Sequence, residues 1–157
     1  MESILEGTEA MRIIKNLSLI KATDIYFRVM REEKAVQDEA VRLNTSQMKD
    51  DFMNSDGVLL SDIGGNYSPF TMSKGRKKSP SSVDLYDTGE FHESFRVQNV
   101  TSTGFDIVSN SVKSDGTDLK VEWGPEIEGL TEAHQVELAE FILDYFFGDI
   151  MKYLNAA

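Results

Sequence analysis

The tripeptide Asp87-Thr88-Gly89 has the residue types that peptide hydrolysis by paired aspartates uses. In that chemistry two Asp carboxylates, here one from each of two copies, share a proton and activate water. The residues before the tripeptide are unfavourable, because Asp84 and Tyr86 occupy the place of a buried apolar strand. We therefore favour a turn in which Gly89 adopts a positive φ and Asp87 caps the turn or a following helix. A dimeric aspartic protease is the alternative.

A short basic run is the second candidate for function. Four basic residues lie within five positions: Lys74, Arg76, Lys77 and Lys78. The spacing of glycine and lysine around them is not that of a phosphate-binding P-loop. Three interpretations stay open: docking onto an acidic partner or another copy, a solvated loop, and contact with nucleic-acid phosphates. Docking is favoured because the 157-residue chain has 16 basic and 27 acidic residues, with a net charge of −11. A specific nucleic-acid partner is not expected, since the chain as a whole is strongly acidic and neutralising phosphates needs an excess of clustered Lys and Arg.

Composition excludes several other kinds of site. There is no cysteine, which rules out disulfides and thiolate chemistry, and the two histidines, His92 and His134, do not have the spacing of a metal motif. We expect no enzyme activity, no metal and no cofactor. No apolar run approaches the length of a membrane span, and the first residues lack the features of a signal peptide. We therefore expect no membrane partner and a cytosolic place of synthesis.

The elements that must position these candidates follow from periodicity. Apolar residues at helical spacing predict one long or two consecutive helices over about residues 6–44, with a break near 16–18 or 22–24. A short helix is expected over 46–53, and Asn54-Ser-Asp-Gly57 ends the helical region. Residues 57–83, which are rich in Gly, Pro and Ser, predict a long loop that carries the basic run.

After the loop, apolar and polar residues alternate, and a helical pattern comes after this stretch. The stretch 91–123 predicts strands near 95–100 and 105–109 and a third strand over 119–123. Residues 132–154 predict a helix with Thr131 as its N-cap. It is apolar around more of its circumference than a surface helix. It is either a central core helix or a helix that contacts another subunit, through Phe146, Phe147 and Tyr153.

The expected fold is a single α+β domain over residues 1–157. Its parts are a helical region (1–56), the long loop (57–83), a region holding an antiparallel sheet of three or four strands (84–131) and a C-terminal helix (132–157) packed on that sheet.

Read together, the central motifs have a recurring layout. A segment Gly64-Gly-Asn-Tyr-Ser-Pro-Phe-Thr71 precedes the basic run, and Leu85-Tyr-Asp-Thr-Gly89, followed by Phe91 and Ser94, comes after it. Further on, Trp123-Gly124 and Gly129-Leu-Thr131 lead into the last helix. Over residues 57–131 the chain resembles the tailed-phage virion morphogenesis and tail-completion proteins, which form head–tail connectors. Their pattern is an aromatic-x-Pro-x-Thr segment, a basic loop and a Leu-x-Asp-Thr-Gly turn.

The resemblance implies a structural virion protein without catalysis. It would work as an oligomeric ring at the neck or tail end, would be assembled in the host cytoplasm, and would have copies of itself and portal, adaptor or tail proteins as partners. The expected interface has three parts. The first part is a docking loop, with Tyr67, Pro69, Lys74, Arg76, Lys77 and Lys78. The second part is the turn that places this loop, with Asp87, Thr88 and Gly89. The third part is the set of C-terminal contacts already named. The alternative to a virion protein is a small non-viral protein-binding module.

Overall fold

The computed structural model describes residues 12–13, 15, 21–75, 77 and 79–155. Within this part of the chain the fold mixes helices with a small antiparallel sheet, as the α+β expectation requires. The start of the helical stretch expected over 6–44, with its possible break at 16–18, lies largely outside the described residues.

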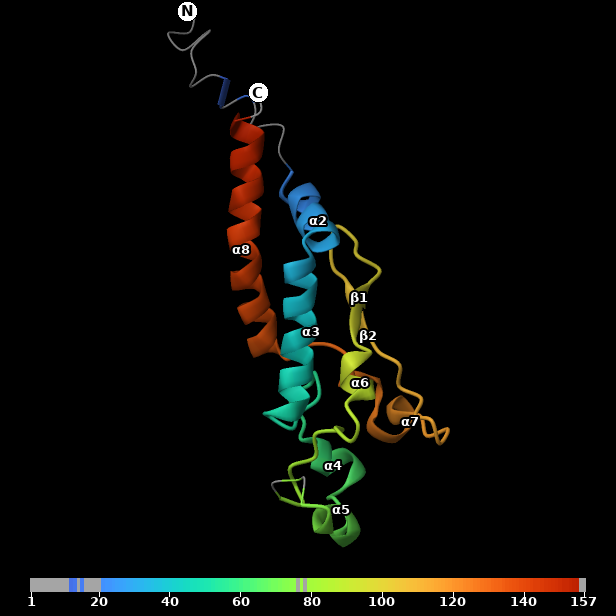
Figure 1. The fold of residues 1–157 in the computed structure, drawn as a ribbon. Coiled ribbons are helices and arrows are strands. Elements are labelled where there is room, and N and C mark those ends of the chain that lie inside the picture. The colour runs from blue at the N-terminus through green and yellow to red at the C-terminus, as the bar shows by residue number, and fades with distance from the viewer. Residues whose placement is uncertain (1–11, 14, 16–20, 76, 78, 156–157) are drawn as a thin grey trace, which may run out of the picture.

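Three helices form the long axis of the molecule (Figure 1). These are α2 (Ala22–Glu32), α3 (Lys34–Lys49) and α8 (Glu132–Asn155). Helix α8 contacts both α2 and α3. Buried residues recur at helical spacing, as with Ile25 and Val29 in α2 and with Val36, Ala40 and Leu43 in α3, so each helix turns one apolar stripe to the core.

The break between the first two helices lies at Glu33, where the backbone is extended, with φ −88° and ψ 98°. The side-chain amide of Gln37 donates to the carbonyls of Met30 (2.9 Å) and Arg31 (3.1 Å). These carbonyls belong to the last turn of α2 and lack helical partners, so Gln37 stabilises the break. The sequence did not indicate this break, because neither position 33 nor position 37 is a Gly or a Pro. The break expected at 22–24 is instead the start of α2.

Helix α3 continues past the expected boundary at residue 44. The Thr45 hydroxyl donates to the carbonyls of Val41 and Arg42 within this helix. The separate helix expected over 46–53 is therefore wrong. The turn expected at Asn54–Gly57 is present, since the Asn54 side chain accepts hydrogen bonds from the backbone N–H groups of Asp56 and Val58. It does not end the helical region, because α3 already ends at Lys49.

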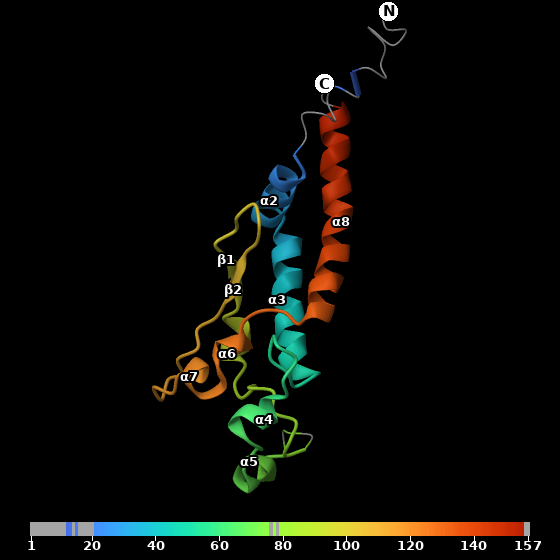
Figure 2. The same ribbon diagram turned by 180° about the vertical axis from the view of Figure 1, so that it is seen from behind.

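The sheet has two strands within the described residues, β1 (Arg96–Gln98) and β2 (Asp106–Val108), which pair antiparallel with Val97 opposite Ile107. Helix α3 contacts β1 on one side and α8 on the other, and the two ribbon views agree on this order (Figures 1 and 2). The expectation that the C-terminal helix packs on the sheet is therefore wrong, because α3 lies between them.

The third strand expected over 119–123 is also wrong, since these residues form helix α7 (Leu119–Trp123). The Asp118 carboxylate caps it by accepting the Lys120 N–H (3.0 Å). Leu119 and Trp123 are buried, whereas Val121 between them is 84% exposed. Residues four apart share a face in both a strand and a helix, so the two buried positions fit either pattern and only the exposure of Val121 separates them.

The region 57–83 is not the continuous loop expected from the sequence. It contains two one-turn helices, α4 (Leu60–Gly64) and α5 (Pro69–Ser73), which lie at the end of the molecule opposite the C-terminus (Figure 1). Pro69 begins α5, and the Ser68 side chain caps it by accepting the Thr71 N–H (3.2 Å). Two further short elements, α6 (Glu90–Glu93) and the 3-10 helix η1 (Pro125–Ile127), complete the described chain.

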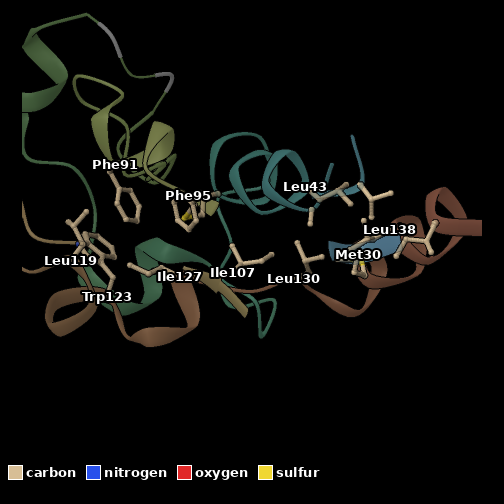
Figure 3. Close-up of a cluster of buried hydrophobic side chains, with 14 of the residues drawn as sticks. Met30, Leu43, Phe91, Phe95, Ile107, Leu119, Trp123, Ile127, Leu130 and Leu138 are labelled. Atoms are coloured by element: carbon tan, nitrogen blue, oxygen red, sulfur yellow. The ribbon is translucent and has the colours of Figure 1, made fainter. Parts of the chain in front are cut away.

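One row of buried side chains connects these parts (Figure 3). It begins at Leu119 and Trp123 of α7 and ends at Met30 of α2 and Leu138 of α8. Thr131 caps α8 as expected, because its hydroxyl accepts the His134 N–H (3.4 Å).

Two buried amides of α3 fix the connection into α8. Asn44 donates to the Ile127 carbonyl (3.2 Å) and accepts the Gly129 N–H (3.2 Å). Gln47 accepts the Thr131 N–H (2.7 Å). Because buried amides must be paired, these bonds hold residues 127–131, which lead into α8, against α3.

Candidate functional site

Asp84 is the centre of a polar cluster that connects Tyr67, which precedes the basic run, with Lys77 of that run. One of its oxygens, Oδ1, accepts hydrogen bonds from the Tyr67 hydroxyl (2.7 Å), from Nζ of Lys77 (2.6 Å) and from the backbone N–H of Tyr86 (2.9 Å). The backbone N–H of Asp84 donates to the Tyr67 hydroxyl oxygen (3.0 Å). We refer to Tyr67, Lys77 and Asp84 as the Asp84 cluster.

Lys77 is held inside this cluster and does not extend into solvent. Its side chain is only 9% exposed, and its ammonium also donates to the Tyr86 carbonyl. The ammonium lies 4.9 Å from the centre of the Tyr67 ring, a cation–π distance. Lys77 was expected to take part in docking; here it anchors the loop from within.

Burial and hydrogen bonding fix the charge states of Asp84 and Tyr67 in the cluster. Burial opposes ionisation of Asp84, but the hydrogen bonds from Lys77 and Tyr67 outweigh it and hold the pKa of the carboxyl below its ordinary value. Burial, together with the hydrogen bond to Asp84, raises the pKa of the Tyr67 hydroxyl well above its ordinary value. Asp84 is therefore a charged acceptor and Tyr67 a neutral donor at neutral pH. Three donors occupy one oxygen of Asp84, an arrangement suited to holding the chain and not to proton transfer.

The Asp-Thr-Gly turn follows this cluster directly. Gly89 adopts a left-handed conformation, with φ +99°, at the N-cap of α6, which is the positive φ expected of it. The Thr88 hydroxyl accepts the Glu90 N–H (3.4 Å), so Thr88, and not Asp87, bonds the first turn of the helix. Asp87 is exposed.

His92 connects α6 back to the cluster. It is buried, and its Nε2–H donates to the backbone carbonyl of Asp84 (2.8 Å). Burial lowers the pKa of His92 below its ordinary value, so the ring is neutral at neutral pH. Its ring forms T-shaped contacts with the rings of Tyr86 and Phe91, at centroid distances of 5.4 and 5.7 Å. The helix that follows the turn is therefore packed against the end of the loop.

A cleft of about 830 Å³ opens beside the cluster. The Asp84 cluster forms part of its wall. The other charged residues of the wall are of both signs: Lys49, Lys74 and Lys113, and Asp50, Asp87 and Glu122. Within the described part of the chain, no group of three or more His, Asp or Glu side chains is placed to hold a metal ion. The cleft thus has no concentrated charge that would favour one kind of charged ligand.

The tip of the molecule, α4 and α5, exposes large apolar side chains. Phe70 is 72% exposed and Ile63 is 40% exposed. The ammonium of Lys74 lies 5.1 Å from the centre of the Phe70 ring, so a cation adjoins the exposed aromatic. We refer to Ile63, Phe70 and Lys74 as the tip surface. Arg76 and Lys78, also expected in the docking loop, lie outside the described residues.

Helix α8 exposes a second apolar surface on the side away from the core. Four large residues of this face are about half exposed or more, and we call them the outer ridge: Val136, Leu143, Phe147 and Met151. Their spacing of seven, four and four places them on one helical face. Glu140 shares that face and Asp144 borders it.

The α8 residues that were expected to contact another subunit differ in their exposure. Phe147 is 58% exposed on the ridge, whereas Phe146 is half-buried against the core. The side chain of Tyr153 lies outside the described residues.

Sequence reasoning missed three features of these surfaces: Phe70, Asp84 and most of the outer ridge. Phe70 lies between two recognised motif residues, and Asp84 is the first acid after the basic run, so both had a local signal. The ridge had none, because an apolar residue in α8 is exposed or buried according to where α3 lies.

None of the described helices has the length and apolar character needed to cross a membrane. Comparison of the chain with protein-family models, with curated proteins and with solved structures finds no match.

Proposed function

We propose that this chain is a structural subunit of a tailed-phage particle, a head–tail connector or tail-completion protein that assembles into an oligomeric ring. It acts by binding copies of itself and neighbouring particle proteins, such as portal, adaptor or tail proteins, and transforms no substrate. The phage assignment rests on the motif layout of residues 57–131.

The observation that carries the assembly role is the exposure of large apolar side chains at two separate places. Phe70 on the tip surface and Phe147 on the outer ridge leave most of their area in water. Exposed aromatic surface of this kind marks protein–protein contacts, where aromatic residues contribute most of the binding energy. Two such surfaces on one chain suit a subunit with a neighbour on each side.

The Asp84 cluster supports the same role, because it prepares the tip for docking. Asp84 ties Tyr67 and Lys77 together, and thereby joins the start and end of the segment that carries α5. A surface that is ordered before binding loses less entropy when it binds. The motif residues shared with the phage proteins thus act as structural supports.

Assembly can be tested on the purified full-length chain. We expect sedimentation velocity over a wide concentration range to show a discrete oligomer and negative-stain electron microscopy to show closed rings. Mass spectrometry of phage particles purified from a host that carries this sequence should recover the chain in constant amount per particle. A chain that is absent from the particles and monomeric in solution would contradict the proposal and favour a small binding module.

The alternative of a dimeric aspartic protease has its own control. Asp87→Asn removes the carboxylate that such a protease requires but leaves an exposed side chain of the same size. We expect the variant to assemble as the wild type does. Peptide cleavage by the wild type that disappears in Asp87→Asn would instead establish the protease.

A further inference from the structure

We infer that the ring contact is formed head to tail, with the tip surface of one copy bound to the outer ridge of α8 in the next copy. This inference rests on the proposed function and identifies the two surfaces that the ring would use.

The two surfaces are complementary in chemistry. The tip surface presents an exposed aromatic ring, Phe70, with the ammonium of Lys74 5.1 Å from its centre. The outer ridge presents Phe147 with two exposed acids along the same side of α8, Asp144 one turn away and Glu140 two turns away. Apolar surface can therefore meet apolar surface while the lysine approaches the carboxylates.

The tip and ridge of one chain cannot bind each other. Helices α4 and α5 lie at the end of the molecule opposite the C-terminal end of α8, as both ribbon views show (Figures 1 and 2). The ridge runs along the side of α8 that faces away from α3. The partner of each surface must therefore come from outside the chain, and a second copy supplies both.

Pairing of two ridges is disfavoured by charge. Glu140 and Asp144 lie near the middle of the ridge, which extends from Val136 to Met151. A two-fold contact centred on the ridge brings the acids of both copies together, whether the helices run parallel or antiparallel. The chain already has a net charge of −11, so such a contact gathers like charges. A tip-to-ridge contact places a cation there instead.

A mixing experiment tests the contact. Phe70→Asp removes the tip surface and Phe147→Asp removes the ridge, and both residues are exposed, so folding should be retained and is checked by circular dichroism. Each variant alone should associate at least about tenfold more weakly than the wild type. An equimolar mixture should form dimers and nothing larger, because one intact tip and one intact ridge are left for each pair.

A matched control and a charge exchange complete the design. Val121→Asp changes an exposed apolar residue of α7 outside both surfaces and should associate as the wild type does. Lys74→Glu and Glu140→Lys should each weaken association by several-fold, whereas the chain that carries both changes should recover it.

Each result has a definite meaning. If Phe70→Asp still dimerises and Phe147→Asp does not, the ridges pair with each other and the inference is wrong. If both variants assemble normally, other surfaces form the ring and the proposed function is unaffected. If the wild type is monomeric at every concentration, the contact is refuted, while recovery of the chain in phage particles would still support the proposed function.

Discussion

At the scale of single residues, Asp84 has more influence on the central segment than the residues of the Asp-Thr-Gly motif beside it. Its carboxylate pairs with Lys77 and accepts the Tyr67 hydroxyl, and its backbone carbonyl accepts a hydrogen bond from buried His92. One side chain and its backbone thus connect the loop, the turn and α6.

Asp84→Ala should destabilise the protein by roughly 2–3 kcal/mol, because it leaves a mostly buried ammonium and a half-buried hydroxyl without their partner. Urea unfolding followed by circular dichroism measures this change. Asp87→Ala, three residues away and exposed, is the control and should change stability by less than about 0.5 kcal/mol. Equal effects of the two substitutions would show that the Asp84 cluster contributes nothing to stability.

The pH dependence of stability should have two stages. Because burial lowers the pKa of His92 below 6.5, the unfolded chain takes up a proton at this residue before the folded chain does, and stability falls as pH falls below about 6.5. Asp149 of α8 is buried and pairs with Arg28 and Lys152, which hold the pKa of its carboxyl below 3.8. The pKa of Asp84 is also below 3.8, so the contributions of both carboxylates are full above that pH and are lost as pH falls further.

His92→Asn should flatten only the first stage, measured as the slope of the unfolding free energy between about pH 7 and pH 5. The slope is informative even if the substitution lowers stability at every pH. An unchanged slope would mean that His92 is not responsible for it.

At the scale of elements, close packing between α4 and α7 decides which residues are tolerated. A Cβ atom at Gly64 would lie 2.4 Å from the ring of Trp123, far inside contact distance. Trp123 is buried, so its ring has little freedom to move.

Gly64→Ala should therefore destabilise the protein by about 1–3 kcal/mol. The matched control is Gly148→Ala in α8, where the added Cβ meets nothing within 4 Å. That change should stabilise the protein by about 0.5–1 kcal/mol, because alanine is the better helix former. Thermal unfolding of both variants should show shifts of opposite sign, and a neutral Gly64→Ala would mean that the two helices are not in close contact.

At the scale of the whole molecule, charge is unevenly distributed. From Asp115 to the end the chain has ten acids and two lysines, whereas Lys74 of the basic run lies on the tip surface. Association between copies should therefore weaken as salt is raised, because the Debye length falls from about 10 Å at 0.1 M to about 3 Å at 1 M.

Replacing Lys74, Arg76 and Lys78 together with serine should weaken association at low salt and make it less sensitive to salt. Lys77 is left in place because the Asp84 cluster needs it. Sedimentation velocity across a salt series, for the variant and the wild type, measures both effects. An unchanged salt dependence would mean that the basic run is only solvated.

The amino-acid sequence by itself determined the features that depend on neighbouring residues. Caps, turns and short-range strand pairing depend on a few adjacent side chains, so they were predictable. These features are the Thr131 cap and the length of α8, the Asn54–Gly57 turn, the positive φ of Gly89 and the hairpin of β1 and β2.

Tertiary structure decided the rest, because its causes are distant in sequence. Leu119 and Trp123 fit a strand or a helix equally well, and only packing leaves Val121 in water. Helix α8 was expected to pack on the sheet, but α3 lies between them, and its position determines that Phe146 faces the core and Phe147 faces outward. No local pattern contains that information, because the exposed side of an apolar helix is determined by the elements that cover its other side.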